Sequence, residues 1–166
     1  MISANRHDNQ KTTMGHGSGN SAYFWLAVNI VASGAIMYLV MFSMIDGWGD
    51  FFNNTNMVYM TLAMLAPMIT LMVLTMPGMY PNRYGNIVLI VFGIVAAVFA
   101  FLAIRQQIAI GDVQFSRSMI PHHSGAILMC RKASLTDHEL ITLCENIVKS
   151  QRDEIAQMNR ILARLR

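Results

Sequence analysis

The chain has 166 residues, of which 54% are hydrophobic and only 13% are charged. This balance lies outside that of ordinary soluble domains, and the mean hydropathy of +0.41 agrees with it. The net charge is +3, but the basic residues are scattered among acidic ones and form no aromatic–basic patch, so no nucleic acid partner is expected. The composition therefore predicts a membrane protein with the lipid bilayer as a partner.

The first 20 residues form a polar tail that is rich in Gly, Ser, Asn and His. Residues 1–20 have no periodic apolar face, so we expect them to be disordered. They also lack the charged, apolar and small-residue order of a cleavable signal, which predicts that the first apolar segment remains as an anchor. His7, Met14 and His16 in the tail offer at most a loose metal site.

Three apolar segments follow within residues 21–105, at 23–45, 57–76 and 87–104. None contains Asp, Glu, Lys, Arg or His. Even the shortest has 18 residues, enough to cross about 30 Å of hydrocarbon, so we predict three transmembrane helices. Because no ionisable residue lies within them, a proton-coupled transporter is disfavoured.

The Lys and Arg residues near the spans predict the orientation. Arg6, Lys11 and Arg83 fall on one side of the membrane, whereas the loop at 46–56 has acidic residues and no basic one. The positive-inside rule places the tail in the cytoplasm and puts the loop on the outer side together with residues 106–166. We expect a bacterial inner (plasma) membrane, with the C-terminal segment in the periplasm.

Methionine is unusually frequent, with 15 residues. At about 3.6 residues per turn, a repeat of four keeps side chains on one broad stripe of a helix. Thioethers select monovalent copper, so such a stripe can hold or pass this ion through an apolar interior. Methionine is also a flexible apolar filler, and packing alone is the alternative. The stripe in the second span consists of Met60, Met64, Met68, Met72 and Met76.

The segment 106–166 predicts two antiparallel helices outside the membrane. Apolar residues at steps of three and four define one face of a helix over 113–132. Pro121 lies inside this helix and is expected to kink it or to start a new helix. The sequence from Thr136 to Glu139 is a capping box that starts the second helix, whose apolar stripe is close to a coiled-coil seam.

The sequence Met119-Ile120-Pro121-His122-His123 is the most distinctive local pattern. A turn near Ser134 predicts that Met119 lies level with residues 148–151 and His123 with residues 144–147. Sulfur ligands select monovalent copper, and imidazole accepts copper, zinc, iron or nickel. The pattern therefore predicts a copper site, with Cu(I) favoured, and its candidate ligands are Met119, His122, His123, Met158, Cys130, Cys144 and Glu154.

Ordinary structural roles are the alternatives for several of these residues. Met119 and Met158 can fill a core, and Cys130 and Cys144 can act as small buried hydrophobes. A disulfide suits an oxidising compartment, although the predicted register separates the two cysteines by more than one turn. Glu154 interrupts an apolar stripe, so it is either exposed or paired with a metal or an arginine.

Residues 111–160 resemble the signature of a bacterial domain-of-unknown-function family that includes periplasmic proteins implicated in copper binding and copper resistance. The resemblance implies a ferritin-like fold and metal binding through Met119, His122, His123 and Met158. It does not cover the three spans. The residues that carry it are Asp112, Phe115, Met119-Ile120-Pro121-His122-His123, Ala126-Ile127, Met129, Leu143, Ile147, Gln151, Glu154-Ile155 and Met158.

Together these patterns predict an all-α protein with three transmembrane helices followed by an antiparallel helical hairpin. The hairpin would be half of a ferritin-like four-helix bundle, which a homodimer or higher homo-oligomer would complete. The predicted function is copper binding for metal homeostasis or resistance, without catalysis. The alternatives are a metal-free, membrane-anchored oligomerisation module and a ferritin-like dinuclear oxidoreductase, which needs a Glu-x-x-His arrangement that is absent.

Overall fold

The computed structural model describes residues 19–165, and the secondary structure in this range is entirely helical. Most of the tail that was predicted to be disordered, including His7, Met14 and His16, lies outside the described residues. Its last two positions, Gly19 and Asn20, belong to the first helix. The elements are α1 (Gly19–Val40), the short 3₁₀ turns η1 (Met41–Met44) and η2 (Trp48–Asp50), α2 (Thr55–Thr75), α3 (Arg83–Gln106), α4 (Asp112–Lys132) and α5 (His138–Arg164).

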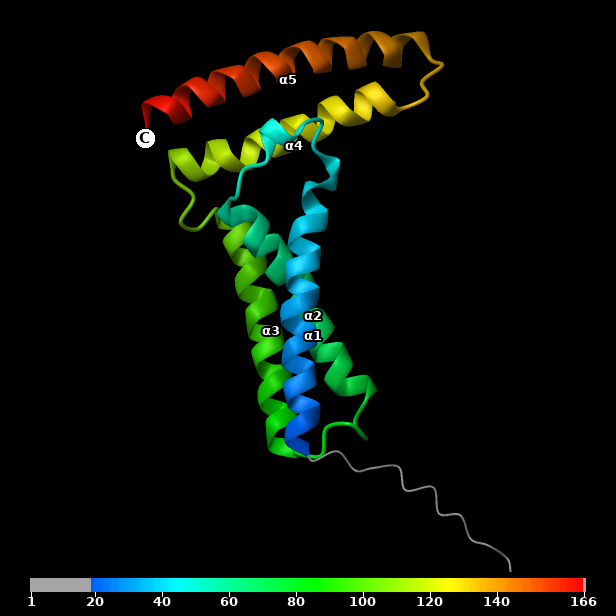
Figure 1. Cartoon of the computed structure of the whole chain (residues 1–166), viewed down its shortest axis with the longest axis vertical. Coiled ribbons are helices and arrows are strands. Elements are labelled where there is room, and N and C mark those ends of the chain that lie inside the picture. Colours follow the sequence, from blue (N-terminus) through cyan, green and yellow to red (C-terminus); the bar gives the residue numbers. More distant parts are fainter. Residues whose placement is uncertain (1–18, 166) are drawn as a thin grey trace, which may run out of the picture.

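Helices α1, α2 and α3 run along the long axis of the molecule, and α4 and α5 lie across one end of this bundle (Figure 1). The segments Ser21–Met44, Thr55–Thr75 and Arg83–Gln106 are each long and apolar enough to cross a membrane. The three predicted spans are therefore confirmed by length and composition, and their ends differ from the prediction by at most four residues.

The tightest packing within the bundle joins α2 to α3 at a glycine. Gly93 is buried, and a Cβ atom added there would overlap the Thr70 hydroxyl and approach the Ala66 carbonyl oxygen to 3.0 Å. Ala100 and Ala103 are also fully buried on the same helix. Small residues let two helix backbones approach closely in an apolar solvent, which explains why α2 and α3 are in such close contact.

Helix α4 is fixed to the bundle by the loop that joins α1 to α2. The Ser124 side chain is fully buried, donates a hydrogen bond to Asp50 Oδ2 (2.5 Å) and accepts one from the Asp46 backbone N–H (2.7 Å). Arg131 pairs with the carboxylate of Asp46 at 2.9 Å. Gly125 lies against this loop as well, because a Cβ there would come within 3.4 Å of the Met44 carbonyl oxygen. The loop and the C-terminal segment are therefore on the same side, as predicted.

Pro121 does not interrupt α4, which is a continuous helix from Asp112 to Lys132. A proline has no N–H to donate, so the carbonyl one turn earlier, that of Arg117, loses its helical partner. The Asn54 side chain takes over this role and donates to the Arg117 carbonyl oxygen at 3.4 Å. Contact with the α1–α2 loop thus satisfies the carbonyl, and no new helix starts at Pro121.

The register between α4 and α5 differs from the predicted one. The N-cap of α5 is Asp137 in place of Thr136, and its carboxylate accepts from the Leu140 N–H at 2.9 Å. The backbone is extended at both Ala133 and Asp137. The connection therefore carries the chain past the end of α4 before α5 begins (Figure 1), and His123 lies opposite Glu154 rather than residues 144–147.

The buried Ser124 hydroxyl generates the first prediction. Replacing it by alanine adds no atoms but leaves the Asp50 carboxylate and the Asp46 N–H without their partner. We expect Ser124→Ala to destabilise the protein by about 1–3 kcal/mol, the usual cost of an unsatisfied buried polar group. Thermal unfolding of the protein in detergent, followed by circular dichroism, measures the change. Ser134→Ala, at an exposed position in the α4–α5 connection, is the control, and equal melting temperatures for the two variants would refute the role of Ser124.

Candidate metal centre between α4 and α5

A histidine and a glutamate meet between α4 and α5. His123 Nδ1 lies 3.1 Å from Glu154 Oε2, with the histidine side chain 11% exposed and the glutamate side chain 46% exposed. Within residues 19–165 no hydrogen bond is formed by this buried nitrogen. The contact is therefore a close approach of a half-buried ring to an accessible carboxylate.

The pKa of His123 is lowered below its ordinary value of 6.5. Burial is the main cause because it penalises the charged imidazolium, and the neighbouring His122 lowers the pKa further, whereas the Glu154 carboxylate opposes both effects. At neutral pH the ring is therefore neutral, with one nitrogen protonated. A proton on Nδ1, which lies 3.1 Å from Glu154 Oε2, would leave the lone pair on Nε2 available as a ligand.

A serine holds the Glu154 carboxylate in place. Ser150 Oγ donates to Glu154 Oε1 at 2.8 Å, so one oxygen of the carboxylate is bound by the serine while the other faces His123. Ser150 was not among the predicted site residues. Its position four residues before Glu154 could have indicated this hydrogen bond, because residues at this spacing are neighbours on a helix surface.

Two methionines lie one helical turn from this pairing. Met119 precedes His123 by four residues on α4, and Met158 follows Glu154 by four residues on α5. Both are half-buried. Because α4 and α5 run antiparallel, one turn back on α4 and one turn forward on α5 reach the same level, so the two thioethers belong to one section of the helix pair. The structure thus brings His123 and Glu154 into contact, and the helix register places Met119 and Met158 one turn along from them.

His122 does not share this interior. It is exposed, whereas His123 is half-buried, because neighbouring positions on a helix point about 100° apart. The two ring centroids are 6.0 Å apart and the planes are inclined by 58°. Of the two adjacent histidines, only His123 faces α5 through its Glu154 contact.

The two cysteines form a disulfide, Cys130–Cys144, with their Cα atoms 5.2 Å apart. The predicted separation of more than one turn was wrong, since it relied on the incorrect register of the helix pair. Neither cysteine is a free thiol in this structure. Their prediction as thiolate metal ligands therefore does not hold for the disulfide form.

The methionine stripe of α2 passes through different environments. Met60, Met64 and Met76 are exposed, and Met68 and Met72 are half-buried. Each step of four residues rotates the position by about 40°, so the four steps from Met60 to Met76 do not keep one face. Met72 packs near the cluster of Leu26, Val73 and Tyr80, while Met60 and Met64 lie on the outer surface of the bundle.

Among residues 19–165, no group of three or more His, Cys, Asp or Glu side chains is arranged to hold a metal ion. A ferritin-like dinuclear centre depends on such carboxylate and histidine groups.

The described structure thus defines a class: an all-helical protein with three apolar helices and an antiparallel helix pair across one end of them. Comparison with known families gives a match of residues 103–164 to a domain of unknown function (DUF305). The uncharacterized protein L153 of Acanthamoeba polyphaga mimivirus is 34% identical over 116 residues, which cover 69% of this chain and 74% of that protein. The chain belongs to the DUF305 family.

The similarity to the viral protein is not confined to the helix pair. The matched stretch of 116 residues is longer than the family domain at 103–164, so part of it lies in the chain before that domain. No solved structure matches the chain.

The lowered pKa of His123 predicts a pH-dependent stability. Since the unfolded histidine takes up a proton before the folded one does, the free energy of unfolding falls as the pH drops below about 6.5. Thermal unfolding between pH values of about 7.5 and 5.5 measures this change. We expect His123→Gln to remove part of the acid-induced loss and the exposed-site control His138→Gln to retain it. An identical pH profile for His123→Gln and the native chain would contradict the assignment.

Proposed function

We propose that the protein is a membrane-anchored metal-binding protein whose α4–α5 pair binds copper, with Cu(I) favoured, for metal homeostasis or resistance. The observation that carries the proposal is the His123–Glu154 pairing, with Met119 and Met158 one turn away. Soft thioether sulfur together with imidazole nitrogen suits monovalent copper better than hard cations.

Glu154 acts in this proposal through His123, as a positioning residue. Histidines that bind metals commonly direct their second ring nitrogen at a carboxylate, which fixes the ring and the tautomer and increases the basicity of the ligating nitrogen. The 3.1 Å contact between Nδ1 and Oε2 has this arrangement, and the Ser150 hydrogen bond supports the carboxylate from behind. His123 Nε2 and the sulfur atoms of Met119 and Met158 would then be the ligands.

The disulfide supports an extracytoplasmic position for α4 and α5. Disulfides persist in oxidising compartments such as the bacterial periplasm and are rare in the cytosol. The Cys130–Cys144 bridge therefore supports the same orientation as the basic residues near the spans. In this orientation the N-terminus is in the cytoplasm. We propose a bacterial inner membrane as the location.

A second candidate function is a metal-free oligomerisation module. It is favoured by apolar side chains of the helix pair that have no cover, among them Leu140 and Leu143 on α5 and Phe115 and Met129 on α4, all of which are exposed. Within residues 19–165, α5 packs substantially on α4 alone. A second copy of the pair would bury these residues and complete a ferritin-like four-helix bundle.

Cu(I) titration of the purified full-length protein against a competing chelator tests the proposal. We expect Glu154→Gln to weaken Cu(I) affinity by about 10-fold to 100-fold, as loss of a supporting carboxylate typically does. His123→Ala and the double variant Met119→Leu/Met158→Leu should weaken it at least as much, because they remove ligands. Glu145→Gln and Met129→Leu, at exposed positions of the same two helices, are the matched controls.

The same titration separates the two functions. A native protein that binds no Cu(I), or His123 and methionine variants that bind it like the native chain, would refute the metal site. Oligomers that form equally well with and without copper would then support the oligomerisation module.

A further inference from the structure

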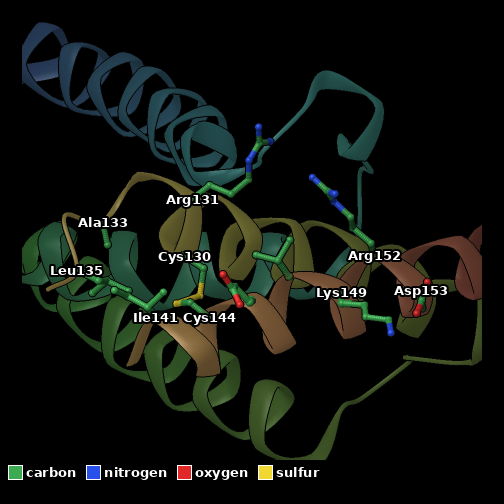
Figure 2. A pocket seen from close by; sticks show the side chains of 11 residues that line it. Cys130, Arg131, Ala133, Leu135, Ile141, Cys144, Lys149, Arg152 and Asp153 are labelled. Carbon is green, nitrogen blue, oxygen red and sulfur yellow. A yellow bond between two sulfur atoms is a disulfide. The ribbon is translucent and has the colours of Figure 1, made fainter. Parts of the chain in front are cut away.

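The disulfide between α4 and α5 lies in an open groove. The groove has a volume of about 600 Å³ and is lined by residues from the end of α4, the connection and the first half of α5. Figure 2 shows the sulfur–sulfur bond between Cys130 and Cys144 within it, with the apolar side chains of Leu135 and Ile141 nearby. Both cysteines are half-buried rather than enclosed, so the bond is open to a small molecule in the groove.

The rim of the groove carries charges of both signs. Arg131, Lys149 and Arg152 are its cations, and Glu145 and Asp153 are its carboxylates. Arg131 is engaged by Asp46, but within the described chain Lys149 and Arg152 form no salt bridge. These two cations are therefore available to attract the carboxylates of a ligand.

Thiol–disulfide exchange requires an attacking thiolate that can reach the sulfur–sulfur bond, and it releases a second thiolate. The half-buried Cys130–Cys144 bond in the open groove meets this requirement.

We propose that Cys130–Cys144 is a thiol–disulfide exchange site for a small anionic peptide thiol of the glutathione type. Such a thiol has two carboxylates and one ammonium group, which match the Lys149 and Arg152 cations and the Glu145 or Asp153 carboxylates of the rim. This inference is independent of the proposed copper site, since it uses none of the ligands assigned to the metal.

The exchange proceeds in two balanced steps. The thiolate of the first small thiol attacks one cysteine sulfur, the sulfur–sulfur bond breaks, and the other cysteine leaves as a thiolate and takes up a proton. The thiolate of a second small thiol then attacks the sulfur of the first in the mixed disulfide, which releases the remaining cysteine. The protein disulfide is reduced to two thiols, and two small thiols are oxidised to one disulfide.

The test measures the reduction rate of the folded, full-length protein by reduced glutathione at low ionic strength. The new cysteine thiols are alkylated and counted by mass spectrometry. We expect reduction without denaturant, and a rate about tenfold lower for Lys149→Glu/Arg152→Glu, because the charges that attract the anionic thiol are reversed. The uncharged thiol 2-mercaptoethanol should reduce the native and variant proteins at rates within about twofold, since it lacks the carboxylates that the rim attracts.

A matched control separates local recognition from net charge. Arg160→Glu/Arg164→Glu makes the same charge change at exposed positions near the other end of α5 and should leave the glutathione rate unchanged. If Lys149→Glu/Arg152→Glu fails to fold, Lys149→Gln/Arg152→Gln takes its place with a smaller slowing of about threefold. The proposal would be overturned if glutathione reduced the disulfide only after the protein unfolds. It would also be overturned if the groove variant and the control variant slowed the reduction by glutathione equally.

Discussion

Three consecutive residues of α4 face three different surroundings, and the arrangement of the extramembrane part depends on this. His122 is exposed, His123 faces Glu154 on α5, and Ser124 is buried against the α1–α2 loop. Neighbouring positions of a helix point about 100° apart, so one helix can contact solvent, a partner helix and the membrane bundle with adjacent side chains. α4 thereby joins α5 to the apolar helices.

Because α4 lies between the α1–α2 loop and α5, its polar side chains contact both of them. Ser124 and Arg131 bind the two acidic side chains of the loop, so Asp46 and Asp50 are satisfied within the protein rather than by an external cation. On another side of α4, His123 Nδ1 lies 3.1 Å from Glu154 Oε2, and Met119 and Met158 are one helical turn away along α4 and α5. The proposed copper chemistry uses the second side, while the first fixes the helix that carries it.

The sequence predicted those features that composition and helical periodicity determine. The three spans appear as uninterrupted apolar segments, and helical spacing places Met119 one turn from His123 and Met158 one turn from Glu154. The register was missed because it depends on the extended residues between Ala133 and Asp137, which no periodic pattern reveals. The same error hid the Cys130–Cys144 bridge. The buried role of Ser124 was also out of reach, since it depends on a loop some 75 residues earlier in the chain.

X-ray absorption spectroscopy at the copper edge of Cu(I)-loaded protein tests the central claim most directly, because it reports the ligand atoms themselves. We predict a mixed first shell of nitrogen and sulfur in the disulfide form of the protein, with the sulfur contribution lost in Met119→Leu/Met158→Leu. Bound copper with a shell of nitrogen and oxygen alone, or a sulfur shell that survives in this variant, would contradict the account.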